Sequence, residues 1–199
     1  MEVWGVVLKG YFIQYKFIIP ESVKHSSYTY QKLFRALYGY SQIVSKSNGK
    51  TYNYHRSGVL SKTPYVRPGK NCVIIPQNSF QELINYFKTG KNPGHYWQVK
   101  GDWKAVYYMD EKELEHEKII EAMEGLVDRS YVLSPNKEHS KLIDEMEIIA
   151  NSQNQVQEGH KKAIVSKAQE IATMPWFKEA HQKSVTLKKF HELYSKLKA

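Results

Sequence analysis

Alternating hydrophobic and polar positions near the start of the chain predict a β-strand. The alternate large side chains of this segment are Tyr11, Ile13, Tyr15, Phe17 and Ile19. Gln14 and Lys16 lie among the intervening positions, and Pro20 ends the run. Side chains two residues apart share one face of a strand, so we expect one face of this strand to be buried. The first element is therefore predicted to be β.

A β-hairpin is predicted from residues 40–57. The dipeptide Asn48-Gly49 separates residues 40–47 from the polar and aromatic segment 50–57. Asn-Gly is typical of a two-residue hairpin turn, because both turn positions adopt a positive φ. The sequence thus predicts two antiparallel strands joined at this dipeptide.

Two short helices are predicted on either side of a loop. Serines at 26–27 can cap a first helix, and Gly39 is suited to end it in a left-handed conformation. Ser79 followed by Glu82 has the spacing of a capping box, and Gly90 follows the apolar positions of this second helix. Both helices are expected to be short.

A loop, a buried strand and a second hairpin complete the first part of the chain. Prolines and a glycine make the stretch after Gly58 a loop with turns, and residues 71–75 read as a buried strand. Segments 95–100 and 103–109 flank a Gly-Asp dipeptide at 101–102. This dipeptide predicts a second hairpin turn.

From Asp110 onward the apolar residues recur at helical spacing. Their stripes predict about four helices, with a last stripe of Trp176, Phe177, Ala180, Leu187, Phe190 and Leu197. Strands followed by helices favour an α+β fold. We expect a hairpin-rich antiparallel domain with two short helices over residues 1–109, followed by a C-terminal helical region over residues 110–199.

Charge is distributed unevenly along the chain. The net charge is +9, and residues 22–81 hold nine Lys or Arg, seven Tyr and no Asp or Glu. Residues 1–109 carry a net +11 and residues 110–199 a net −2. Solvated surfaces usually mix both signs, so a 60-residue stretch without carboxylates indicates a polyanionic partner.

Several classes of protein are disfavoured. The apolar runs are far shorter than the roughly 20 residues of a membrane span, and the start Met1-Glu2-Val3-Trp4 has no basic leader. We expect a cytoplasmic protein, in its own cell or in a host cell, that is not secreted and binds no membrane. The single cysteine, Cys72, excludes an intrachain disulfide and a Cys-based zinc site.

A nucleic-acid-binding surface is the leading interpretation. Lys50, Tyr52, Tyr54 and Arg56 share one face of a strand, where rings can stack on bases and cations can neutralise phosphate. The chain has 25 Lys and only 4 Arg, which favours sequence-tolerant contact with the backbone of single-stranded DNA or RNA. The residues expected to contact nucleic acid are Lys32, Arg35, Lys46, Lys50, Tyr52, Tyr54, Arg56, Lys62, Tyr65, Arg67 and Lys70.

Two other functions stay open. The basic face could dock on an acidic protein, in a protein–protein interaction or structural module. A nuclease could use Mg²⁺ held by Glu82 and Asp102 with Lys104 beside them. It could also act without a metal, through His55 beside Tyr54 and Arg56 or His95 beside Tyr96. Glu82 and Asp102 are already explained by a cap and a turn, so the chain is expected to be non-catalytic, with no catalytic residue, metal ligand or cofactor assigned.

The near-neutral helical region is expected to serve as a scaffold or as an oligomerisation element. Pairing of two chains through these helices would double the basic surface and strengthen binding to a polyanion. A homodimer or other homo-oligomer built on the C-terminal helices is therefore part of the expectation.

Overall fold

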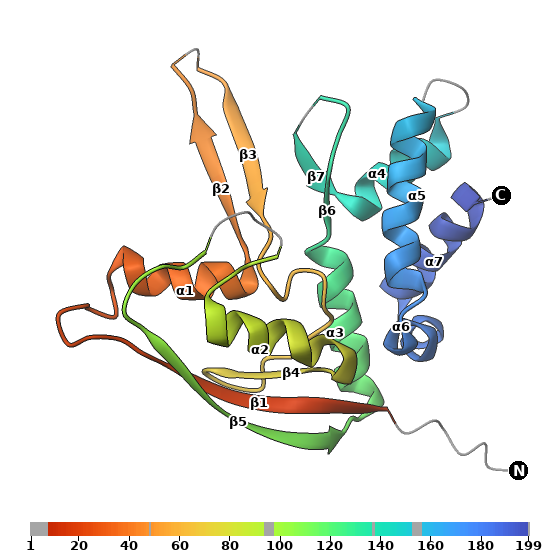
Figure 1. The fold of residues 1–199 in the computed structure, drawn as a ribbon. Helices are drawn as coiled ribbons and strands as arrows, with labels where there is room; N and C mark the ends of the chain where they lie inside the picture. Colours follow the sequence, from red (N-terminus) through yellow and green to blue (C-terminus); the bar gives the residue numbers. More distant parts are fainter. Residues whose placement is uncertain (1–7, 48, 94–97, 137, 153–156, 199) are drawn as a thin grey trace, which may run out of the picture. The chain divides into compact units, whose positions relative to one another are not determined.

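Strands come first along the chain and most helices follow, which is the order of a mixed α+β protein (Figure 1). The computed structural model describes residues 8–47, 49–93, 98–136, 138–152 and 157–198. The α+β fold class expected from the sequence is confirmed. Contacts among Cα atoms divide the chain into two compact units.

The two units are not consecutive segments of the chain. The first comprises Met1–Tyr40 and Arg56–Lys118, and the second comprises Ser41–His55 and Ile119–Ala199. The sequence had suggested a division into 1–109 and 110–199, with the hairpin in the basic part. The contacts group the hairpin with the helices, where the ring of His55 stacks on that of Tyr131.

An antiparallel sheet forms one layer of the first unit. Its central strand is β1 (Lys9–Ile18), with β4 (Cys72–Pro76) on one side and β5 (Lys104–Glu113) on the other. The alternation predicted for the first strand is confirmed, because Ile13, Tyr15 and Phe17 are buried whereas the intervening Gln14, Lys16 and Ile18 are exposed. One face of the sheet therefore carries the core.

Two helices cover that face. They are α1 (Tyr28–Tyr38) and α2 (Phe80–Thr89), the latter preceded by the 3₁₀ turn η1 (Gln77–Ser79), and both lie on the same side of the sheet (Figure 1). The expected Ser27 cap of α1 is present, because the Ser27 Oγ accepts a hydrogen bond from the Tyr30 amide at 3.3 Å. Gly39 follows the helix with a positive φ of 78°, but its ψ of 175° differs from the left-handed helical conformation that was expected.

The start of α2 differs from the predicted capping box. The Ser79 side chain makes no capping bond in the described residues and instead lies 3.4 Å from Asn78 Oδ1. The reason is the preceding 3₁₀ turn, which leaves Ser79 in a helical conformation, whereas a capping residue needs an extended one. The predicted end of α2 is confirmed, because Gly90 has a φ of 67°.

Aromatic rings fill the space between the sheet and the two helices. The ring centre of Phe17 lies 5.2 Å from that of Phe34, 5.8 Å from that of Trp103 and 5.9 Å from that of Phe87. The buried Tyr86 hydroxyl donates a 2.7 Å hydrogen bond to the Leu33 carbonyl and so ties α2 to α1. These edge contacts add to the free energy gained by burying the rings.

The second predicted hairpin joins residues 95–100 to the strand that follows Gly101-Asp102. In the structure this strand, β5, pairs along its length with β1, for example Met109 with Ile13. Of the expected partner strand, residues 94–97 lie outside the described residues, and Gln98 forms a single bridge with Lys91. A turn dipeptide identifies a local bend and does not specify which distant strand pairs with β5.

The segment after the first hairpin is more buried than a surface loop. Val59, Leu60 and Val66 are 1–3% exposed. The amides of Val59 and Leu60 donate 2.9 Å hydrogen bonds to the carbonyls of Ala36 and Leu37, which lie in the last turn of α1 where helix carbonyls have no partner within the helix. This segment therefore supplies hydrogen-bond donors to the end of α1 and does not form a surface loop.

The second unit consists of two hairpins and the C-terminal helices. One hairpin is formed by β2 (Tyr40–Ser45) and β3 (Thr51–Arg56), and the other by β6 (Tyr131–Leu133) and β7 (His139–Lys141). The predicted first hairpin is confirmed, and Gly49 has the expected positive φ of 74°. Asn48 lies outside the described residues.

The helices of the second unit match the predicted stripes. They are α3 (His116–Asp128), whose first residues belong to the first unit, α4 (Leu142–Asn151), α5 (Glu158–Ala172), α6 (Pro175–Ala180) and α7 (Val185–Lys198), with the 3₁₀ turn η2 (His181–Lys183) before α7. The predicted last helix is divided into α6 and α7, but every residue of its stripe is buried. No helix within the described residues is long and apolar enough to cross a membrane.

Candidate nucleic-acid interface

Tyrosine rings and lysines gather on one face of the β2–β3 hairpin. The rings of Tyr52 and Tyr54 lie 6.3 Å apart with an interplanar angle of 30°, as expected for two side chains of the same parity. The Lys46 ammonium lies 4.5 Å from the centre of the Tyr52 ring, and the Lys46 amide donates a 2.9 Å bond to the Lys50 carbonyl. We call Lys46, Lys50, Tyr52 and Tyr54 the hairpin cluster.

An arginine and two tyrosines stack in the first unit. The Arg67 guanidinium lies 4.5 Å from the centre of the Tyr38 ring, and the Tyr65 ring lies 5.5 Å from the same ring. The Tyr38 hydroxyl is 2.8 Å from that of Tyr15. Burial raises the pKa of the Tyr15 and Tyr38 phenols above the usual value for tyrosine. We call Arg67, Tyr38 and Tyr65 the Arg67 stack.

Tyr65 is less accessible than the sequence suggested. A loop residue was expected to present its ring to solvent, but the ring of Tyr65 packs on Tyr38 and is half-buried. The buried path of the chain beside α1 causes this difference, because it turns the residues next to Tyr65, Pro64 and Val66, into the core. Arg67 and Lys70 are exposed, as expected.

A second arginine lies between tyrosines at the surface of α1. The Arg35 guanidinium lies 5.4 Å from the centre of the Tyr28 ring and 5.1 Å from that of Tyr40. Tyr28 is exposed, and Tyr40 begins β2. Lys32, one turn before Arg35, is partly buried. We call Arg35, Tyr28 and Tyr40 the Arg35 stack.

These ring contacts do not cancel the positive charge of residues 22–81, which we call the carboxylate-free window. A carboxylate would cancel the charge of its partner, whereas an aromatic ring is neutral and only orients the cation. Arg35, Lys46 and Arg67 each lie over a ring of the same carboxylate-free window. The window therefore presents net positive charge together with flat aromatic surfaces.

The predicted contact residues do not form one patch in a single unit. Lys46, Lys50, Tyr52 and Tyr54 belong to the second unit. The remaining predicted residues belong to the first unit and are Lys32, Arg35, Arg56, Lys62, Tyr65, Arg67 and Lys70. Each unit thus carries its own basic, tyrosine-rich surface.

The chain matches no known relative. Comparisons with protein-family models, with curated proteins and with solved structures find no match. Function is therefore inferred from the side chains and their arrangement.

The residues considered for a metal-dependent nuclease lie in or beside elements that stabilise the fold. Glu82 lies in the first turn of α2, where a carboxylate interacts favourably with the helix dipole. Trp103, between Asp102 and Lys104, packs in the core, and its indole N–H donates a 3.1 Å bond to the Val99 carbonyl. Among the described residues, no group of three or more His, Cys, Asp or Glu side chains could hold a metal ion.

A histidine cluster in the second unit was not predicted. The His55 ring stacks on the Tyr131 ring with 4.3 Å between centres and 19° between planes, and the His139 ring centre is 6.4 Å from that of His55. His55 Nδ1 is 3.2 Å from the Ser41 hydroxyl. Sequence reasoning associated His55 with Tyr54, its neighbour in the chain, but missed the β6–β7 hairpin that supplies the other rings.

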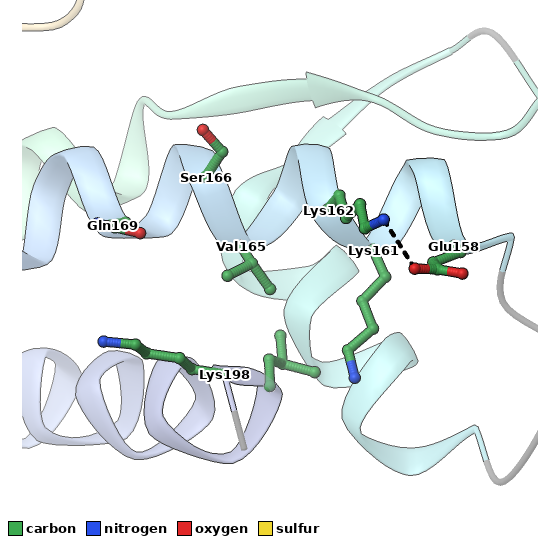
Figure 2. Close-up of a pocket in the computed structure, with 8 residues that line it drawn as sticks. Glu158, Lys161, Lys162, Val165, Ser166, Gln169 and Lys198 are labelled. Atoms are coloured by element: carbon green, nitrogen blue, oxygen red, sulfur yellow. Dashed lines mark ion pairs between the residues drawn. The ribbon is translucent and has the colours of Figure 1, made fainter.

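An open cavity of about 460 Å³ lies between α5 and α7 in the second unit. Lys161 and Lys162 of α5 and Lys198 of α7 line it, together with the apolar side chains of Val165 and Leu197 (Figure 2). Lys162 is paired with Glu158 at 2.8 Å. Its polar lining side chains, which are three lysines together with Glu158, Ser166 and Gln169, are all exposed, so none of them is a buried polar group of the kind that orients a small ligand.

Proposed function

We propose that the protein is a non-catalytic protein that binds single-stranded DNA or RNA with little sequence preference. The observation that carries this proposal is the carboxylate-free window in which Arg35, Lys46 and Arg67 lie over tyrosine rings. Positive charge beside exposed or half-exposed rings matches the two repeating features of a single strand, its phosphates and its unpaired bases.

The composition supports a tolerant mode of binding. Lysine contacts phosphate as a point charge, and most cations of the chain are lysines. Tyrosine stacks on any base, since every base has a π face. The hairpin cluster combines both side chains on one strand pair, so it is the surface on which the proposal is tested first.

Charge reversal in the hairpin cluster should weaken binding and reduce its salt dependence. For Lys46→Glu with Lys50→Glu, we expect affinity for a single-stranded oligonucleotide to fall at least about tenfold at low salt. The slope of log affinity against log salt should fall by about 1.4, because two phosphate contacts release about 0.7 counterion each. Fluorescence anisotropy at several salt concentrations measures both quantities.

The matched control reverses two exposed lysines of α7 in the same unit, Lys188→Glu with Lys196→Glu. Net charge changes equally, so binding that depends on total charge alone would fall equally in both variants. Equal losses would reject the hairpin cluster as the contact surface. No binding of wild-type protein to any DNA or RNA at low salt would reject the proposed function.

Loss of a stacking ring should weaken binding without changing its salt dependence. We expect Tyr54→Leu to reduce affinity for a single strand about 5- to 150-fold, since one stacked base contributes about 1–3 kcal/mol. The salt slope should stay as in the wild type, because no cation is lost. A fall in affinity for duplex DNA as large as that for a single strand would contradict the stacking role.

Metal-independent RNA cleavage is a second candidate function, favoured by the 6.4 Å separation of the His55 and His139 rings. Two imidazoles at this spacing could flank one phosphodiester. One would take the proton of the 2′-hydroxyl as its oxygen attacks phosphorus, and the other would protonate the departing 5′-oxygen. The products would be a 2′,3′-cyclic phosphate and a 5′-hydroxyl.

The cleavage test uses RNA and DNA oligonucleotides of one sequence, with a metal chelator present. Cleavage of RNA alone, lost in both His55→Ala and His139→Ala, would support the second candidate. Intact RNA bound by the wild-type protein would remove it and would leave the binding function in place.

A further inference from the structure

Strand β5 is an edge strand with a large apolar surface. In the sheet order β4-β1-β5, β1 occupies one side of β5, and no strand among the described residues pairs with the other side (Figure 1). Four consecutive side chains at its centre are exposed, namely Val106 at 48%, Tyr107 at 41%, Tyr108 at 61% and Met109 at 39%.

Such an edge is unusual in a protein that stays monomeric. Unpaired N–H and C=O groups on a long strand form a template for another strand, and natural edges are normally short, charged or covered. At the opposite edge of the same sheet, Ile74 of β4 pairs with Val66, which covers part of that strand. β5 has ten residues, and the segment from Ala105 to Met109 has no charged side chain.

We propose that two copies of the protein pair through β5, edge to edge and antiparallel, about a two-fold axis at Tyr107. This pairing would join the two sheets into one continuous six-stranded sheet. The charges on β5 favour a second copy as the partner. Lys104 and Asp110 lie equally far on either side of Tyr107, so two antiparallel copies centred there place opposite charges across from each other.

The cross-strand pairs follow from the strand sequence. With Tyr107 opposite its own copy, Lys104 faces Asp110 of the other chain, and Val106 faces Tyr108. Opposite charges directly across a strand pair stabilise it, as do aromatic and β-branched side chains. The two-fold axis repeats both pairs, so one interface contains each of them twice.

The two neighbouring registers bring like charges together. Residues directly opposite each other in an antiparallel pair point to the same face of the sheet. The two-fold axis must therefore pass through a residue, and another register is obtained by moving the axis to another residue. An axis at Tyr108 would place Lys104 opposite Lys112, and an axis at Val106 would place Asp102 opposite Asp110. Like charges directly opposite are destabilising. An axis at Met109 would place Asp110 opposite Tyr108 and Lys112 opposite Val106, without any pair of opposite charges, so Tyr107 is favoured over these three registers.

The charge pattern gives a direct test in the full chain, freed of nucleic acid. Sedimentation equilibrium should show a wild-type dimer. Lys104→Asp and Asp110→Lys should each raise the dimer dissociation constant at least about tenfold, through a like-charge pair repeated by symmetry. The double variant should recover dimerisation, because its pairs are again opposite in charge.

A monomer at every wild-type concentration would overturn the proposal. A wild-type dimer that both single variants leave unchanged would overturn it equally, since the interface would then lie elsewhere, for example on the C-terminal helices. Thermal melting of each variant shows whether the fold survives, as Asp110 also pairs with Lys112 at 2.8 Å within the chain.

Disulfide trapping checks the register independently of charge. In a Cys72→Ser background, Tyr107→Cys should form an interchain disulfide on mild oxidation, because Cβ atoms directly across a strand pair lie about 4.5–5.5 Å apart. Met109→Cys is the matched control, and its two copies would be four residues out of register. Trapping at 109 but not at 107 would contradict the proposed axis.

Discussion

Replacement of Gly58 by alanine should unfold or severely destabilise the first unit. A Cβ at this position would lie 2.1 Å from the Gly39 amide nitrogen and 2.6 Å from the Leu37 carbonyl oxygen. Both are backbone atoms at the end of α1, so no side-chain rotation relieves the overlap. We expect the free energy of unfolding to fall by about 3–5 kcal/mol, the upper range for single substitutions.

The backbone around Gly58 cannot move away without losing other bonds. Its amide donates a 2.7 Å hydrogen bond to the Ser61 hydroxyl, and the next two amides bond to carbonyls of α1. Moving the segment would leave these buried groups without partners, which costs about 1–3 kcal/mol for each group. The close approach of the two chain segments therefore requires glycine.

Gly69→Ala is the matched control for this prediction. It lies in the same loop, its added Cβ would meet no atom within 4 Å, and its φ is not in the left-handed region. We expect its stability to stay within about 0.5 kcal/mol of the wild type. Urea titration followed by near-UV circular dichroism compares the two variants. Equal stability of Gly58→Ala and Gly69→Ala would show that the approach at Gly58 is looser than the structure indicates.

Local features of the fold could be predicted from the sequence because their causes lie within a few residues. The alternation in β1, the Ser27 cap and the turn glycines at 39, 49 and 90 all depend on neighbouring positions. The helical stripes of the second unit are equally local. These signals were sufficient for the α+β class.

The pairing of β5 could not be predicted in the same way. Its partner β1 is far away in the sequence, as the pair Met109 and Ile13, 96 residues apart, shows. Such a pairing joins residues far apart in the sequence, whereas the Gly-Asp dipeptide at 101–102 indicates only a local bend. The buried course of residues 58–66 was missed for a related reason, since its partners are the last carbonyls of α1.

The candidate site was predicted in part. Strand parity correctly placed Tyr52 beside Tyr54, because that relation is set by two residues of one strand. The rings beneath Arg35 and Arg67 come from separate elements, so the sequence showed the side chains but not their stacking. Charge composition therefore located the basic window, and tertiary packing determined which of its rings stay accessible.

Stability should fall steeply once the pH rises above about 10. Three phenols of the first unit, those of Tyr15, Tyr38 and Tyr86, have their pKa values raised, mainly by burial. Tyr15 and Tyr86 are at most 2% exposed. A phenolate in these positions would lose its hydration, so the folded protein keeps the three protons.

The sign of the effect follows from proton binding. Above the ordinary tyrosine pKa of about 10, an unfolded chain releases these protons whereas the folded chain retains them. The unfolded state then binds fewer protons, so its free energy falls relative to the folded state as pH rises. One retained proton costs about 1.4 kcal/mol of stability per pH unit, and the two buried phenols of Tyr15 and Tyr86 together cost about 3 kcal/mol per pH unit. Below pH 10 the same groups contribute no pH dependence.

Tyrosinate absorbance near 295 nm, followed together with circular dichroism during alkaline titration, measures this coupling. The last tyrosines should ionise only as the near-UV signal of the folded core disappears. Tyr86→Phe removes one retained proton but also the bond to the Leu33 carbonyl, so we expect lower stability at pH 7 and a shallower fall above pH 10. Tyr28→Phe, which alters an exposed ring, should leave the slope unchanged. Full ionisation of all fifteen tyrosines in a protein that stays folded would contradict the burial of these phenols.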